Sequence, residues 1–141
     1  MTGSVLIINK SEKEKRLMAS MLSSFQLNFS YAEHGREALA LAKRVRPSLV
    51  ISHIQHEVMD GITMADIMQK DKALRNTPII FVHDELNLSL IAAAKQVNSK
   101  AFLIKPYINN SLIYAVKKAL ESVENDHVNI GDNLVKSYLY A

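Results

Sequence analysis

Histidines and a carboxylate stand at positions from which a small protein could do chemistry. His53 and His56 follow one short apolar run, and His83 and Asp84 directly follow another. Imidazoles with a carboxylate are ligands that zinc, copper or nickel accept, although this spacing matches no established metal motif. These residues therefore raise the hypothesis of a transition-metal sensor.

Two lysines favour a different chemistry for the same residues. Lys10 and Lys105 also follow apolar runs, and each would place a positive charge near the histidines. That charge opposes a cation, so we favour hydrogen-bonded or solvated histidines over a metal site. Lys10, Lys105 and a protonated His53 or His83 could instead hold sulfate, phosphate or carboxylate. Because histidine titrates near neutrality, such a pocket would respond to pH.

Short elements of alternating type must position these side chains. Continuous apolar runs are typical of buried parallel strands, and alternation of apolar and polar residues is typical of a strand nearer the sheet edge. The expected strands are 5–8, 27–31, 49–52, 77–82 and 101–104. Apolar residues at helical spacing predict helices over 12–25, 35–45, 62–72, 86–97 and 110–123.

Local signals support these elements and predict their arrangement. Ser11 and Glu14 form a capping box at the start of the first helix, Gly35 marks the turn into the second, and Pro47 ends it. Five strand-then-helix units predict an α/β fold, a doubly wound parallel sheet with the flavodoxin-like strand order 2-1-3-4-5 between two helix layers. Ligands of such sheets bind beyond the carboxyl ends of the strands, where the candidate residues stand.

Composition limits the classes of protein. The chain has 141 residues, of which 48% are hydrophobic and 22% charged, which suits one globular domain. No stretch approaches a membrane span and no signal peptide is visible, so we expect a cytoplasmic protein without membrane contact. The net charge of +3 is small and its cations are dispersed, so we expect no nucleic-acid partner. The absence of cysteine excludes disulfides and thiolate metal sites.

The run from Pro47 to Gly61 has the frame of a strand that carries a phosphoryl acceptor. Four residues stand between Ser48 and His53, and the run ends in Met-Asp-Gly. With Pro78 before the fourth strand and Pro106 after the fifth, it resembles a response regulator receiver domain (CheY-like). The resemblance covers roughly residues 4–122, which gives a receiver-like domain over 1–123 and a C-terminal tail over 124–141.

The resemblance implies a metal site and an acceptor whose residues are replaced here. Where the family has two acidic residues that bind Mg²⁺, this chain has Asn9 and Lys10, and Glu12 nearby is expected to face solvent or cap the helix. His53 stands at the position of the phosphoacceptor aspartate. We therefore expect no Mg²⁺ cofactor, no phosphorylation of His53 and no catalytic residue.

The positions that the resemblance assigns to switching are changed as well. His83 replaces the family's switch serine or threonine, and Phe102 stands at the aromatic position that couples to it. Lys105 is the member of the family's catalytic set that remains, and we expect it to reach solvent or pair with Asp84. We expect Phe102 to pack in the domain without switching.

These features favour a degenerate pseudo-receiver, a non-enzymatic module of bacterial two-component or phosphorelay signalling whose protein interactions do not depend on phosphorylation. A receiver with altered chemistry, in which His53 is phosphorylated or the pocket senses an anion, is one alternative. The transition-metal sensor is another. An enzyme has no support, because no glycine-rich phosphate loop, nucleophile elbow or paired carboxylates are visible.

A protein partner is expected on the face made by the fourth helix, fifth strand and fifth helix, or on the tail. Apolar and aromatic side chains of the kind that interfaces favour stand there, namely Leu86, Leu88, Leu90, Tyr107 and Tyr114. The tail itself has an apolar spacing compatible with a short amphipathic helix. It could fold back on its own domain, form a homodimer or bind another partner. The residues of this spacing are Ile130, Leu134, Val135, Tyr138 and Leu139.

Overall fold

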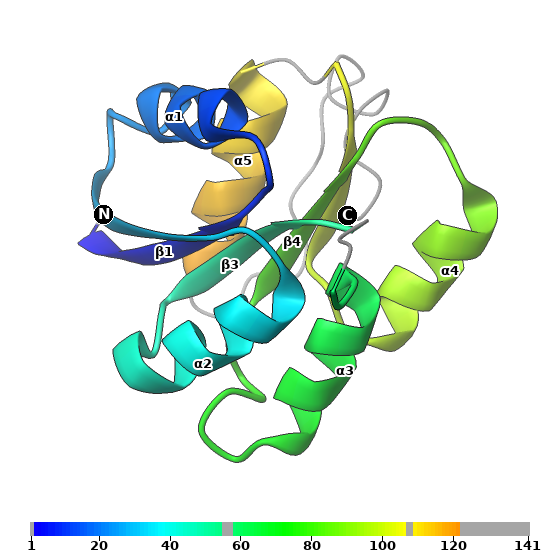
Figure 1. Ribbon diagram of the computed structural model, residues 1–141. Coiled ribbons are helices and arrows are strands. Elements are labelled where there is room, and N and C mark those ends of the chain that lie inside the picture. The colour runs from blue at the N-terminus through cyan, green and yellow to red at the C-terminus, as the bar shows by residue number, and fades with distance from the viewer. Residues whose placement is uncertain (1, 55–57, 107–108, 122–141) are drawn as a thin grey trace.

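The computed structural model describes residues 2–54, 58–106 and 109–121, in which strands and helices alternate along the chain (Figure 1). The strands are β1 (Thr2–Ile8), β2 (Gln26–Ala32), β3 (Leu49–His53), β4 (Ile79–His83) and β5 (Ala101–Ile104). The helices are α1 (Glu12–Met21), α2 (Gly35–Val45), α3 (Gly61–Lys70), α4 (Leu88–Gln96) and α5 (Asn109–Leu120).

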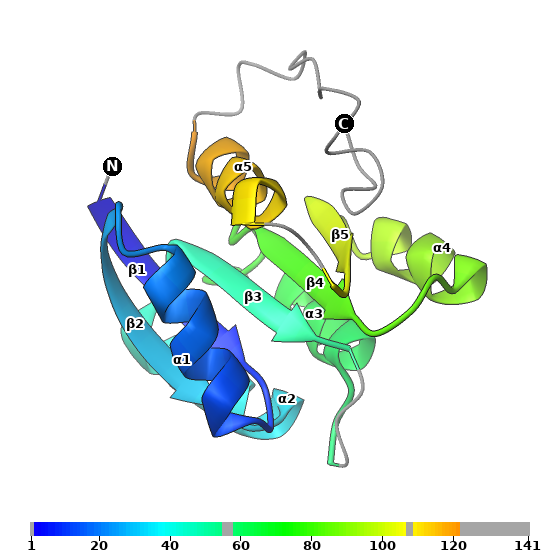
Figure 2. The same cartoon turned by 90° about the horizontal axis from the view of Figure 1, so that it is seen from above.

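The strands form one parallel sheet in the order β2-β1-β3-β4-β5, which confirms the predicted fold. Helices α1 and α5 cover one face of the sheet, and α2, α3 and α4 cover the other (Figures 1 and 2). The predicted three-layer architecture is therefore present. Because every strand runs the same way, the carboxyl ends of β1, β3, β4 and β5 meet at one edge.

The central strands are buried on both faces, as their continuous apolar runs predict. Leu6 to Ile8 of β1, Leu49 to Ile51 of β3 and Ile80 to Val82 of β4 have no exposed surface. Phe81 and Phe102 are the largest buried side chains. Each large apolar side chain buried in this way contributes about 1.5–3 kcal/mol to folding.

Helix α1 ends at Met21, four residues before the predicted end at residue 25. Beyond it the backbone closes short turns, in which the Ser23 amide donates to the Ser20 carbonyl and the Phe25 amide to the Leu22 carbonyl. Serine favours such turns because its hydroxyl competes for backbone hydrogen bonds. The apolar spacing nevertheless continues through Leu22 and Phe25, since both side chains pack in the core after the helix has ended.

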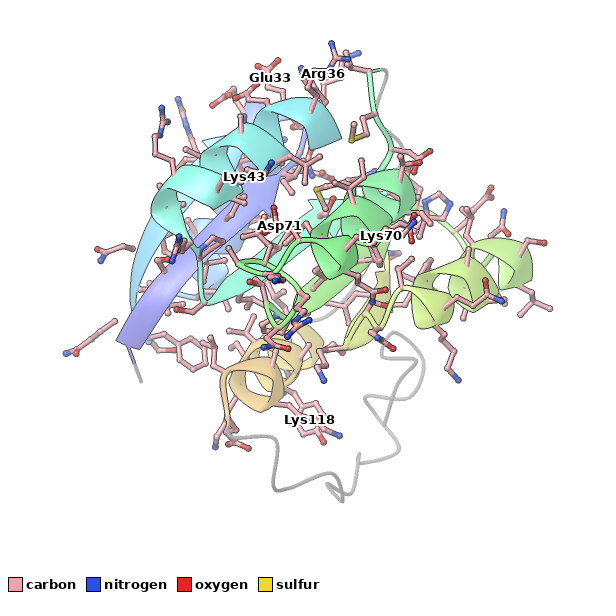
Figure 3. All side chains as sticks on the ribbon, turned by 90° about the horizontal axis from the view of Figure 1, so that it is seen from below. Glu33, Arg36, Lys43, Lys70, Asp71 and Lys118 are labelled. Carbon is pink, nitrogen blue, oxygen red and sulfur yellow. The ribbon has the colours of Figure 1, made fainter. Side chains whose placement is uncertain are left out.

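Helix α2 has its predicted bounds, and local chemistry accounts for both ends. The His34 side chain accepts a hydrogen bond from the Glu37 amide at the start. Arg46 adopts a left-handed conformation with φ of 46° at the end, and its amide donates to the Ala42 carbonyl. A Lys43–Asp71 ion pair of 3.8 Å links this helix to the segment after α3 (Figure 3).

Two predictions fall partly or wholly outside the described residues. The division between domain and tail near residue 123 and the apolar helix in the tail both lie there, as do His56 and Tyr107. Among the residues that the structure does describe, no helix is both long enough and apolar enough to span a bilayer.

Candidate functional site

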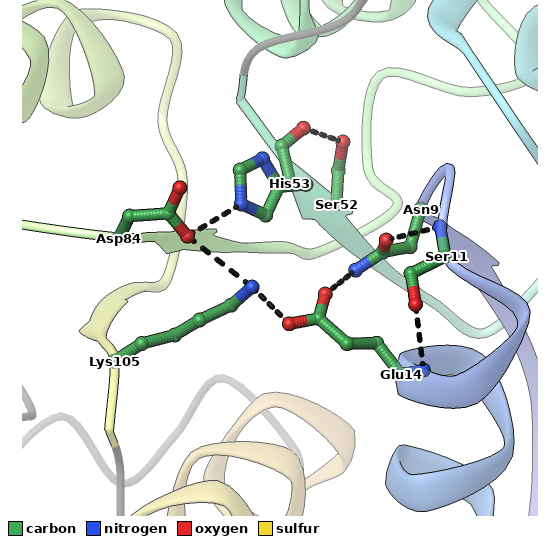
Figure 4. Close-up of polar contacts among 7 residues, drawn as sticks. All are labelled: Asn9, Ser11, Glu14, Ser52, His53, Asp84 and Lys105. Atoms are coloured by element: carbon green, nitrogen blue, oxygen red, sulfur yellow. Dashed lines mark hydrogen bonds and ion pairs between the residues drawn. The ribbon is translucent and has the colours of Figure 1, made fainter.

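The candidate site lies at the carboxyl edge of the sheet, where four parallel strands end side by side (Figure 4). Asn9 directly follows β1, His53 ends β3, His83 ends β4 with Asp84 next, and Lys105 directly follows β5. The fold thus brings together His53, His83, Asp84 and Lys105 from three predicted strands.

Lys105 is held between two carboxylates. Its ammonium donates to Glu14 Oε1, and it lies 3.3 Å from Asp84 Oδ1. The Lys105 and Glu14 side chains are 23% and 30% exposed, whereas the Asp84 side chain is 64% exposed. The Glu14 contact is therefore the more sheltered of the two, and we expect it to be the stronger.

Asp84 extends the ion pairs to the histidine at the end of β3. The same Oδ1 that faces Lys105 lies 3.2 Å from His53 Nε2. Glu14 extends them in the other direction, because its Oε2 accepts a hydrogen bond from Asn9 Nδ2. One polar chain thus runs His53, Asp84, Lys105, Glu14, Asn9 across the edge of the sheet (Figure 4), and we call it the edge network.

Glu14 reaches the edge network because another residue makes one of the two hydrogen bonds of its capping box. The Ser11 hydroxyl accepts from the Glu14 amide at 3.2 Å, which is the ordinary half of the motif. In the other half a glutamate would accept from the Ser11 amide, but here Asn9 Oδ1 accepts that hydrogen bond at 2.8 Å. The Glu14 carboxylate is left to face Lys105.

Both carboxyl groups of the edge network have lowered pKa values. Burial alone would raise the pKa of Glu14, yet hydrogen bonds from Lys105 and Asn9 outweigh it and hold the pKa below its ordinary value. A hydrogen bond from His53, followed by one from Lys105, lowers the pKa of Asp84. The two groups are therefore carboxylates at neutral pH.

His83 lies behind the edge network and is only 3% exposed. Its ring centroid is 6.1 Å from that of His53 and 6.1 Å from that of Phe102, whose ring it meets edge-on. Burial, and next the neighbouring His53, lower the pKa of His83, which favours a neutral imidazole. Its Nδ1 is buried and has no hydrogen-bond partner among the described residues.

The remaining candidates differ in exposure. Lys10 is exposed, and Glu12 is exposed and pairs with Lys15 at 2.7 Å. In the described ranges, no three histidine, cysteine or acidic side chains come together in a way that could hold a metal ion. Phe102 is fully buried.

Sequence reasoning missed Glu14 as a site residue, since it assigned Glu14 to the helix cap alone and weighed Glu12 as the nearby carboxylate. The available signal was Asn9, two residues before Ser11. An asparagine there can accept from the backbone amide two residues on, which releases the capping-box glutamate for other contacts.

Comparison with known proteins decides the family. A model of the response regulator receiver domain matches residues 5–117. The chain belongs to this family. The receiver domain therefore accounts for most of the sequence and for the five strands apart from the first residues of β1, and it places the chain in two-component signalling.

Individual relatives are distant in sequence and similar in length. Protein PilG of Pseudomonas aeruginosa is 25% identical over 118 residues, which cover 84% of this chain and 87% of that protein. The polar-differentiation response regulator DivK of Brucella ovis is 26% identical over 120 residues, or 85% and 98% of the two chains.

Solved receiver structures share the fold. The signal receiver domain of an HD domain-containing protein from Pseudomonas fluorescens superposes with a TM-score of 0.78 at 25% identity, covering 85% of this chain and 95% of that one. The chemotaxis response regulator CheY4 of Vibrio cholerae superposes with a TM-score of 0.77 at 24% identity, covering 85% and 100%. At this identity the CheY4 likeness concerns the fold.

Proposed function

We propose that this receiver domain is a non-enzymatic pseudo-receiver, which binds a protein partner in bacterial signalling without being phosphorylated. The observation that carries the proposal is the edge network. Lys105 is the lysine that the family uses to stabilise a phosphoryl group, and here its ammonium already forms ion pairs with Glu14 and Asp84. His53, at the position that the resemblance gives to the acceptor, faces one of the same carboxylates.

The residues at the strand ends do not fit the Mg²⁺ ion that receiver chemistry employs. A hard cation needs several oxygen ligands, and the family supplies them from an acidic pair. Here Asn9 Oδ1 accepts the Ser11 amide, and the Glu14 and Asp84 carboxylates share the Lys105 ammonium. The Lys105 ammonium thus already occupies the carboxylates that a metal ion would need.

Phosphoryl transfer to His53 is opposed by the charges around it. A transferred phosphoryl group carries negative charge that must be stabilised as it develops. The ionised Asp84 carboxylate lies 3.2 Å from His53 Nε2 and would repel that charge. The buried, neutral imidazole of His83 replaces the hydroxyl that closes on the phosphoryl group in the family.

The proposed partner surface is the α4–β5–α5 face. Leu86, just before α4, is 62% exposed and Leu88, its first residue, is 75% exposed, while Leu90 is half-buried against the core. Large apolar side chains at this exposure become favourable contacts when a protein partner excludes water from them. The interaction needs no change at the strand ends, because these leucines are already exposed.

The test is phosphotransfer from acetyl phosphate to the full chain, with and without Mg²⁺, read by intact mass. We expect no phosphoryl adduct under either condition. His53→Ala is the diagnostic variant, and His34→Asn is its control, because it removes a histidine outside the edge network and keeps an N-cap side chain. A stoichiometric adduct that is lost in His53→Ala and kept in His34→Asn would overturn the proposal.

One contact favours an alternative, a receiver with altered chemistry. A carboxylate that holds one imidazole nitrogen orients the ring, and Asp84 is placed to do so for His53. The phosphotransfer result decides between this function and the pseudo-receiver.

A further inference from the structure

The outer flank of α5 carries a buried cation. The helix packs Leu112, Ala115 and Val116 against the sheet. Tyr114 and Lys118 are four residues apart, so they follow one another along a different stripe of the helix. The Nζ atom of Lys118 and the hydroxyl of Tyr114 are nevertheless buried.

Lys118 lacks the acceptor that a buried ammonium requires. Within the described residues, no oxygen accepts a hydrogen bond from its Nζ atom. An ammonium taken out of water without an acceptor is strongly unfavourable. The described chain ends at Glu121, three residues further on. Figure 3 shows Lys118 on α5, well apart from the Lys43–Asp71 pair. An acceptor has therefore to be sought outside the described residues, and residues 122–141 are the part of the chain outside them that lies nearest to Lys118 in sequence.

We propose that residues 122–141 dock in cis along this flank of α5, and that the acidic stretch 124–126 supplies the carboxylate that accepts from Lys118 Nζ. Charge complementarity supports the pairing, since the last turn of α5 contains Lys117 and Lys118 and the acidic stretch contains Glu124 and Asp126.

The connection is long enough for this contact. Lys118 and Glu121 are separated by about 4.5 Å along a helix axis. Three extended residues from Glu121 to Glu124 span up to about 10 Å, so the chain can turn back past the end of the helix. A connection this short also gives the acidic stretch a high effective concentration at Lys118, which favours the same chain over a second copy.

We expect the apolar residues of the tail to cover the rest of this flank of α5. A chain that turns back at residue 124 and runs antiparallel to α5 passes Tyr114 one turn after Lys118. Tyr114 packs against the core of the domain, and this burial chiefly raises the pKa of its hydroxyl. The tail positions available to cover it are the spaced apolar residues Ile130, Leu134, Val135, Tyr138 and Leu139.

A docked tail would limit access to the partner face. Helix α5 is part of that face, so a partner that binds this flank must displace the tail. This consequence rests on the proposed function, whereas the docking itself does not.

Paramagnetic relaxation tests the docking in the full chain. The chain has no cysteine, so Asn129→Cys gives a single nitroxide site in the tail. Arg36→Cys gives a control site at the start of α2, which covers the other face of the sheet and lies far from Lys118 (Figure 3). We expect the tail label to broaden amide resonances around Tyr114 and Lys118, and the control label to leave them sharp. No broadening at α5 would overturn the proposal.

A mixed sample separates cis from trans docking. Isotope-labelled chain without nitroxide is combined with nitroxide-labelled chain at natural isotope abundance. We expect the α5 resonances to stay sharp in the mixture. Broadening there would mean that the tail docks on a second copy, which contradicts the proposal.

A double-mutant cycle tests the ion pair itself. Lys118→Met is combined with Glu124→Gln/Asp126→Asn, and Asp132→Asn is the control because it removes a tail carboxylate beyond the acidic stretch. We expect Lys118→Met and the acidic-stretch variant to couple in urea denaturation, and Asp132→Asn to be additive with Lys118→Met. Additivity throughout would overturn the pairing. A phosphorylated chain whose tail still docks would refute the proposed function alone.

Discussion

Replacing Lys105 by methionine tests the edge network at its centre. Methionine keeps an unbranched apolar stem of similar length but removes the ammonium that lies between Glu14 and Asp84. Both carboxylates would remain without their cation. We therefore expect Lys105→Met to lower the free energy of unfolding at neutral pH.

The size of the loss follows from the exposure of the two partners. A hydrogen bond to a charged group contributes about 1.5–3 kcal/mol, and the Glu14–Lys105 pair, with side chains 30% and 23% exposed, belongs at the lower end. Asp84 is 64% exposed, so its ion pair adds at most about 0.5 kcal/mol. The expected loss for Lys105→Met is about 2 kcal/mol.

The loss should depend on pH in a defined direction. The lowered pKa of Glu14 means that the unfolded chain binds a proton first as the pH falls. The stabilisation is fully present above the ordinary glutamate pKa of about 4.3 and disappears as the pH falls through the lowered value. The difference between the parent chain and Lys105→Met should therefore shrink in acid.

Urea denaturation of both proteins at neutral and acidic pH measures this difference. Lys70→Met is the matched control, because it removes one exposed ion pair of 3.2 Å with Asp66 and should cost no more than about 0.5 kcal/mol. A Lys105→Met loss no larger than that of Lys70→Met, or one that stays constant into acid, would refute the reasoning.

Three further changes test the surrounding structure by urea denaturation. The lowered pKa of His83 makes the fold lose stability as the pH falls below the ordinary histidine value of about 6.5. His83→Leu should therefore flatten the pH dependence of the free energy of unfolding between neutral and mildly acidic pH, and an unchanged slope would contradict this. Gly61→Ala should cost about 2 kcal/mol, because an added Cβ would lie 2.9 Å from the His53 carbonyl oxygen and 3.0 Å from Phe81 Cε1; a neutral change would mean that this turn is free to move. Arg46→Gly should stabilise by about 0.5–1 kcal/mol, because φ of 46° suits glycine, and a loss would show that the Arg46 side chain matters.

The fold could be predicted from the sequence because local and global signals agree. Central strands that are apolar on both faces must be covered on both faces, and the alternation with amphipathic helices leaves a doubly wound parallel sheet. Periodicity was misleading at the end of α1, because Leu22 and Phe25 are core residues in a turn. Spacing alone does not distinguish a core residue in a helix from one just beyond it.

The candidate site could be predicted in part. Parallel strands bring their carboxyl ends together, so the proximity of His53, His83 and Lys105 followed from the topology. The role of Glu14 did not, because it depends on which acceptor takes the Ser11 amide. Two acceptors compete for that amide at the start of α1, and the choice of Asn9 over Glu14 is settled by three-dimensional geometry.

The most direct test of the closed edge network is the response of the backbone amide resonances of the full chain to acetyl phosphate and Mg²⁺ together. The account predicts that the resonances of His53, Lys105 and helix α4 keep their positions, because Lys105 is already held by Glu14 and Asp84. Saturable shifts at His53 and Lys105 that extend into α4 would contradict it, since they would mean that the site opens, takes up the phosphoryl group and switches.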